Sequence, residues 1–205
     1  MRPAVRKLNR QVHIYTGLAL LLFTILFSGS GLLLNHHWAS ADFWPQRKIQ
    51  TVERTFSPPS GVGDLAVARE LMRQFGLRGE ISTTETTPNG GLLVRANRPG
   101  ENLTIEADLI AGRATVERVD LNGWGVVHTL HTFIGVSATE PERRRDWWLT
   151  TLWSLAIDAT AIGLILLVAG GVVEAWAANP KRGALVTIFV VGTAGCLAFV
   201  LGLVR

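Results

Sequence analysis

The chain has 205 residues, with 20 Lys or Arg against 16 Asp or Glu, so its formal net charge is +4. The basic residues gather at the ends of hydrophobic segments rather than on one periodic face, which argues against nucleic acid as a partner. Cys196 is the only cysteine, so an intramolecular disulfide is excluded, and it lies within a hydrophobic run. The length leaves room for one small water-soluble domain beside the hydrophobic segments.

Three hydrophobic runs cover residues 12–34, 148–173 and 184–204. Each exceeds the ~20 residues that a helix needs to cross a bilayer, so we expect an integral membrane protein surrounded by lipid. Basic residues precede the first run, and Lys181 and Arg182 lie between the second and third runs. Because cytoplasmic loops carry an excess of Lys and Arg, this bias predicts a cytoplasmic N-terminus and an extracytoplasmic loop between the first two spans.

The first run is also longer than the apolar core of a signal peptide, which usually has about 7–15 residues. We therefore favour a retained anchor, with cleavage near Ala39-Ser40-Ala41 as the alternative. The predicted fold class is an α-helical membrane protein with three transmembrane helices plus a small α+β extracytoplasmic domain. Its segments are the N-terminus with the first helix (1–37), the α+β domain (38–122), an interfacial segment (123–146), the second helix (147–176), and a cytoplasmic turn with the third helix (177–205).

Within the extracytoplasmic segment, residues 48–55 alternate weakly and predict a first strand. Apolar residues at i, i+3 and i+4 spacing then predict a helix over 64–75, with Asp64 as its N-cap and Gly76 as its C-cap. Four strand-like stretches separated by turn signals follow, at 80–87, 91–97, 102–107 and 113–119. One helix against a small antiparallel sheet is the expected plan.

Residues 123–135 are apolar but too few to span a bilayer, and the polar stretch 137–146 follows them. We expect a separate interfacial helix and then a loop. Tryptophan is enriched where membranes meet water, and the sequence suggests such a belt at both ends of the second span. Its predicted members are Trp38, Trp124, Trp147 and Trp148 on the outer side and Trp176 on the inner side.

Several motifs together resemble the PepSY-associated transmembrane family. The resemblance follows the order of the motifs along residues 5–175, and each motif alone is weak. They are Arg10-x-x-His13-x-x-x-Gly17, Phe27-Ser-Gly29, Leu32-Leu-Leu-Asn35, the run LTIEADLIAGRATVERV at 103–119, and Trp124-x-x-x-His128-x-x-His131.

This resemblance implies a bacterial inner-membrane protein whose loop is a periplasmic PepSY-like domain. Larger members of the family are linked to ferric-siderophore reduction, and hence iron uptake, and to b-type haem. This chain departs from those members because it is short, has three spans and contains only five histidines. A bacterial envelope location also suits an extracytoplasmic domain that has no disulfide.

Four of the histidines lie where the first two spans should meet the outer membrane surface. His36 and His37 end the first span, and His128 and His131 precede the second. A b-type haem is usually held by two imidazoles from different helices, so one histidine of each pair could hold a single outer haem. The preferred combination is His131 with His37 or His36. Two alternatives stay open: a surface Zn²⁺ or Cu²⁺ site, and interfacial histidines that bind no metal.

His13 lies on the cytoplasmic side, roughly 35 Å from His36 along a helix. No histidine occurs in the second or third span. A second bis-histidine haem within one chain is therefore not expected, and it would need a homodimer, a partner subunit or another ligand type. The alternative is that His13 is a polar anchor beside Arg10.

Asp158 lies roughly 16 Å below Trp147, near the bilayer centre. A carboxylate there costs a few kcal/mol on insertion scales, so it should be paired, protonated or inside the helix bundle. It is a candidate proton or ion relay, or a polar contact for a cofactor or another subunit. The structural alternative is a hydrogen bond to Thr160, Ser28 or Ser30.

Three function classes remain. The first is a haem-b electron-transfer subunit linked to periplasmic iron or siderophore reduction. The second is a membrane-anchored binding module whose PepSY-like domain engages an envelope protein, and the third is an accessory subunit of a larger membrane complex. The soluble part shows no Ser/His/Asp set, no phosphate-binding glycine loop and no metal-spaced carboxylate cluster. Whether the chain is an enzyme stays open, and an electron donor would have to come from elsewhere.

Overall fold

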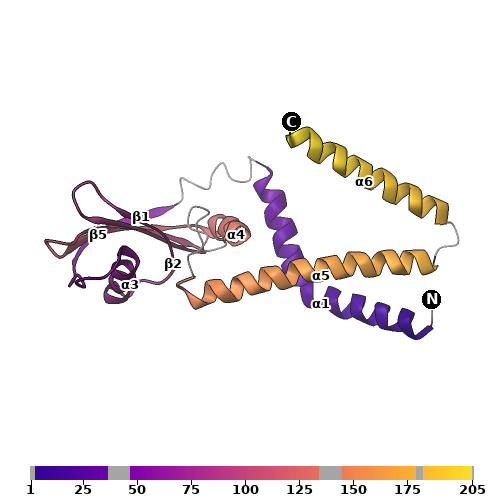
Figure 1. The fold of residues 1–205 in the computed structure, drawn as a ribbon, viewed down its shortest axis with the longest axis horizontal. Helices are drawn as coiled ribbons and strands as arrows, with labels where there is room; N and C mark the ends of the chain where they lie inside the picture. Colours follow the sequence, from indigo (N-terminus) through magenta and orange to yellow (C-terminus); the bar gives the residue numbers. More distant parts are fainter. Residues whose placement is uncertain (1–2, 37–46, 134–144, 179–181, 205) are drawn as a thin grey trace. The chain divides into compact units, whose positions relative to one another are not determined.

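The computed structural model describes residues 3–36, 47–133, 145–178 and 182–204 (Figure 1). The chain forms two compact units. One comprises Met1–Thr24 with Asp158–Arg205, and the other comprises Ile25–Ile157. The boundary therefore falls inside two long helices, and each unit is described on its own.

Three helices are long and apolar enough to cross a membrane, which confirms the three predicted spans. They are α1 (Pro3–Leu34), α5 (Trp148–Ala178) and α6 (Arg182–Val204). α1 begins earlier than the apolar run because the basic residues before it continue the same helix. Most described side chains of these helices are exposed, as expected where the surrounding medium is apolar.

In the first unit, α1 packs on α5 at glycine positions. Gly163 leaves so little space that a Cβ there would collide with Leu20, and a Cβ at Gly17 would lie 3.6 Å from Leu167. Small residues at such crossings let two helix backbones approach closely, and dispersion contacts then hold them. Gly163 of α5 thus serves helix packing.

The second unit contains a five-stranded antiparallel sheet in the order β1-β5-β4-β3-β2. The strands are β1 (Lys48–Thr55), β2 (Glu80–Thr86), β3 (Leu92–Arg98), β4 (Glu101–Asp108) and β5 (Arg113–Asp120). They confirm all five predicted strands, with ends shifted by at most a residue or two. One face packs on helix α3 (Asp64–Phe75), and the core between them includes Leu71, Leu92, Val94, Leu103 and Ile105.

The N-cap of α3 differs from the residue that the sequence predicts. Gly63, not Asp64, is the N-cap residue, and Asp64 is the first helical residue. The Asp64 carboxylate instead accepts a hydrogen bond from the Thr86 hydroxyl at 2.9 Å, so it ties the helix start to β2. The predicted C-cap is confirmed, because Gly76 adopts a left-handed conformation with φ of 65° and its N–H donates to the Arg73 carbonyl.

Helix α4 (Gly123–Thr132) follows the sheet and ends before α5 begins, which confirms a separate helix in the predicted interfacial segment. The Asn122 side chain caps its N-terminus by accepting a hydrogen bond from the Gly125 N–H at 3.1 Å. Of the predicted tryptophan belt, Trp124, Trp148 and Trp176 are exposed, and Trp38 lies outside the described residues. α4 carries His128 and His131, so it positions half of the candidate site.

Candidate functional site

His131 lies against the C-terminal part of α1, where its ring makes a hydrogen bond. Its Nδ1 lies 2.7 Å from the Ser30 hydroxyl oxygen, and that hydroxyl donates its proton to the Phe27 carbonyl at 3.1 Å. Where the Ser30 proton points to the Phe27 carbonyl, Ser30 accepts from His131 and Nδ1 carries a proton. In a neutral imidazole the lone pair then lies on Nε2, the atom available to bind a metal.

The residues around this ring explain why α4 can approach α1 so closely. A Cβ at Gly31 would lie 3.4 Å from Cε1 of His131, and Ser30 itself is almost fully buried. The Phe27 ring stands edge-on to the imidazole, with 5.7 Å between ring centroids and 61° between planes. On its other side Phe27 lies 6.0 Å from Trp153 of α5. The imidazole is therefore oriented by small and aromatic residues of two candidate spans.

The other three histidines of the predicted cluster are His36, His37 and His128. His36 is exposed, and its Nδ1 lies 2.8 Å from the Leu32 carbonyl, which can only accept, so this Nδ1 is also a donor. His128 lies one turn before His131 on α4. His37 lies outside the described residues. Within the described ranges, no three His, Cys, Asp or Glu residues gather as a metal site.

His13 belongs to the first unit and packs against α5. It lies beside Gly170 and Gly171, where a Cβ would come within 4 Å of its ring. Its Nδ1 is buried and has no hydrogen-bond partner in the described part of the chain. One turn away, the Asn9 amide donates to the Gly170 carbonyl at 3.1 Å and to the Glu174 carboxylate at 3.2 Å.

Asp158 is exposed on α5. Thr160 is buried, so the two side chains lie on different faces of the helix. The Ser30 hydroxyl already joins His131 and Phe27. Asp158 has no hydrogen bond or ion pair with another described residue, which leaves its outward-facing carboxyl as a candidate contact for a partner.

A buried carboxylate links the sheet domain to α5, and sequence reasoning missed it. Glu80 at the start of β2 is 1% exposed, and it accepts hydrogen bonds from the backbone N–H groups of Asp146 and Trp147. Arg69 of α3 pairs with the Asp146 carboxylate. Alternation gives no signal for it, because Glu80 and its neighbour Ile81 are both buried although they point to opposite faces of the strand.

Two charged clusters of the sheet domain shift the pKa values of their members. Hydrogen bonds from Arg73 and Gln74 lower the pKa of Glu70 to about 2. The hydrogen bond to Asp120, together with the nearby Glu101 carboxylate, raises the pKa of Arg118. These groups are paired within the sheet and helix surface, so we interpret both clusters as structural.

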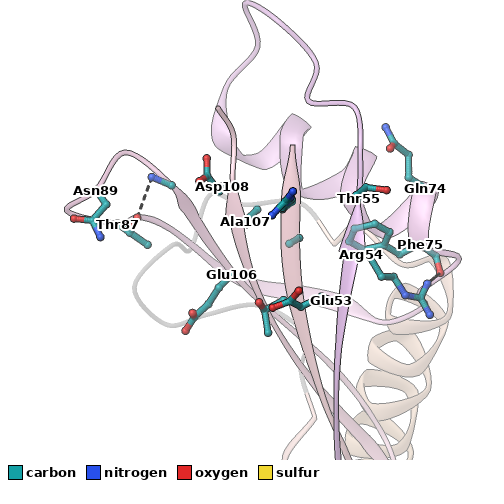
Figure 2. Close-up of a pocket in the computed structure, with 14 residues that line it drawn as sticks. Glu53, Arg54, Thr55, Gln74, Phe75, Thr87, Asn89, Glu106, Ala107 and Asp108 are labelled. Carbon is teal, nitrogen blue, oxygen red and sulfur yellow. Dashed lines mark hydrogen bonds between the residues drawn. The ribbon is translucent and has the colours of Figure 1, made fainter. Parts of the chain in front are cut away.

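A hollow of about 1070 Å³ lies at the end of the sheet where β1 and β4 end and β3 and β5 begin. Figure 2 shows Arg54 and Phe75 together on one side and Thr87 and Asn89 on the turn at the other. The Arg54 guanidinium donates to the Phe75 carbonyl at 2.9 Å and lies over the Phe75 ring. The Arg113 side chain, by contrast, has no hydrogen bond or ion pair with a described residue, so the hollow offers an available cation.

No family model, no curated protein and no solved structure matches the chain. The resemblance to the PepSY-associated family therefore rests on the motifs themselves.

Proposed function

We propose that the chain is a bacterial inner-membrane protein of the PepSY-associated kind that binds one haem b near the outer membrane surface. In this proposal it passes electrons toward a periplasmic acceptor such as a ferric chelate. His131 would be one ligand of the haem iron, and His37 or His36 would be the other. The periplasmic location of the sheet domain belongs to the same proposal, because it follows from the charge bias and the resemblance.

The observation that carries this proposal is the hydrogen bond between His131 and Ser30. Histidines that bind metals almost always donate their other ring N–H to an acceptor, which fixes the tautomer and the ring orientation. The Ser30 hydroxyl lies 2.7 Å from Nδ1 and would supply that acceptor, and no described residue binds Nε2. The Nδ1 of His36 has a carbonyl acceptor as well. The donor set thus fits an iron ligand, and haem would supply one-electron chemistry when bound.

The proposal places one redox centre on the outer side. His13 has no histidine partner in α5 or α6, so electrons arriving from the cytoplasm would need a partner subunit or a second copy of the chain. In this proposal, Phe27 and the buried Ser30 would hold the His131 imidazole in place and exclude water around it.

The test is the visible spectrum of the full chain purified in mild detergent, first oxidised and then reduced with dithionite. A Soret shift with a sharp α band would support the proposal. His131→Ala should abolish the haem signal, whereas His13→Ala should retain it. A colourless wild-type protein purified from haem-supplemented cells, or full haem occupancy in His131→Ala, would contradict it.

A second candidate function is a membrane-anchored module that binds an envelope protein without redox chemistry. The observation that favours it is the hollow at the sheet end, which is large, polar and carries both signs of charge. Arg113→Glu would then weaken binding of the partner, while the spectrum would stay that of a colourless protein. An accessory role in a larger complex would instead use the outward-facing Asp158.

A further inference from the structure

A separate apolar cavity of about 350 Å³ lies in the second unit between α4, α5 and the turn after β3. Pro99 of that turn forms one wall, and Leu130 and Phe133 at the end of α4 form another. Leu152 and Ala156 line it from the first turns of α5. The cavity is neither the histidine site nor the hollow at the sheet end, and the proposed function makes no use of it.

The cavity opens to the surface, and its lining offers water few hydrogen-bond partners. The only polar side-chain groups among the lining residues are the indole N–H groups of Trp147 and Trp153. A buried water needs two to four polar partners, and apolar cavities in proteins stay dry or bind apolar molecules. A cavity of ~150 Å³ already holds benzene, so one of about 350 Å³ takes a longer hydrocarbon group.

The position of the cavity indicates the source of that group. Two of its lining residues, Leu149 and Leu152, are also 39% and 52% exposed on α5, a helix long and apolar enough to span a membrane. The cavity is thus continuous with a surface that meets lipid in the membrane. Burying apolar area is favourable by about 25 cal/mol per Å², and lipid chains are the apolar molecules present at this surface.

We propose that this cavity binds one acyl chain of a membrane phospholipid. The chain would fill the space between α4 and α5 and would contact Pro99 of the sheet domain. The bound lipid would then be part of the junction between the sheet domain and α5, beside the hydrogen bonds that Glu80 makes there. The proposal goes beyond the proposed function, and haem binding does not enter it.

The test counts lipids on the full chain by native mass spectrometry after extensive washing in mild detergent. Wild type should retain one phospholipid per chain. Ala156→Phe fills the cavity and should lose it, whereas Ala159→Phe, on an exposed face of the same helix, should keep it. Circular dichroism checks that both variants are folded, and Ala156→Leu replaces Ala156→Phe if the latter does not fold.

A second measurement uses delipidated wild type titrated with dioleoylphosphatidylglycerol. Binding should saturate at one lipid per chain, and the cavity-filling variant should show no such saturation. Wild type that carries no lipid and takes none up would overturn the proposal. Equal lipid retention by Ala156→Phe and Ala159→Phe would overturn it as well.

Discussion

The Glu80 side chain accepts a hydrogen bond from the backbone N–H of Trp147 at 2.9 Å, one residue before α5 begins. Its other carboxylate oxygen accepts from the N–H of Asp146 at 2.7 Å. These N–H groups belong to the two residues that precede α5, and a carboxylate beside a helix N-terminus interacts favourably with the helix dipole. The sheet domain therefore supplies the N-terminal cap of a candidate membrane helix.

Glu80→Ala should remove this cap and cost about 1.5–3 kcal/mol, the range for hydrogen bonds to charged groups. Hydrogen exchange at the Asp146 and Trp147 amides should accelerate, because both would lose their acceptor. Glu85→Ala on the same strand is the matched control, since its partner Arg95 is exposed. Unchanged exchange at both amides in Glu80→Ala would show that the cap does not form.

Ser30→Ala should weaken haem retention, because His131 would lose the acceptor that fixes its tautomer. Loss of such a supporting group typically costs 10–100-fold in metal affinity. The measurement is haem occupancy during dilution in detergent, with Ser28→Ala on the exposed side of α1 as the control. If the Ser30 and Ser28 variants release haem equally, the hydrogen bond has no role in the site.

Gly163→Val should destabilise the packing of α1 on α5, because a side chain at this position collides with Leu20. Overpacking of this kind typically costs about 1–3 kcal/mol. Gly192→Val in α6, where no described atom lies within 4 Å of an added Cβ, is the control. Thermal unfolding in detergent measures both. Leu20→Ala combined with Gly163→Val should recover part of the loss, and no recovery would contradict the assigned contact.

The Glu70 cluster predicts a pH dependence of stability. The folded-state pKa of Glu70 is about 2, below its ordinary value of 4.5, so its contribution is present above pH 4.5 and is lost as pH falls toward 2. The difference in unfolding midpoint between wild type and Glu70→Gln should be constant at neutral pH and shrink over that interval. A difference that grows on acidification would contradict the lowered pKa.

The sheet domain could be predicted well because each element carries its own local signal. Pro88-Asn89-Gly90 marks the turn between β2 and β3, and Gly76 ends α3 because only glycine adopts its left-handed conformation without strain. The N-cap of α3 could not be predicted, because Asp64 has an alternative partner in Thr86, which is far along the sequence. Long-range competition for a side chain leaves no local pattern.

For the candidate site, too, local features could be predicted from the sequence and long-range contacts could not. Spacing along the chain placed His131 on a helix near the first span, but the choice of Ser30 as its partner depends on how α4 packs on α1. Glu80 was missed because its partners are backbone N–H groups, which carry no sequence signal. The exposure of Asp158 likewise depends on tertiary packing, because the face of α5 that carries the glycines packs on α1.

The order of the strands has a consequence for how the domain assembles. β1 leaves the ribosome first among the strands, yet its only neighbour in the sheet is β5, the last strand made. β2 to β5 form successive hairpins that can pair as they appear, whereas β1 must close a loop of roughly 60 residues, which is entropically slower. We therefore expect β1 to join the sheet last, after α1 has already entered the membrane.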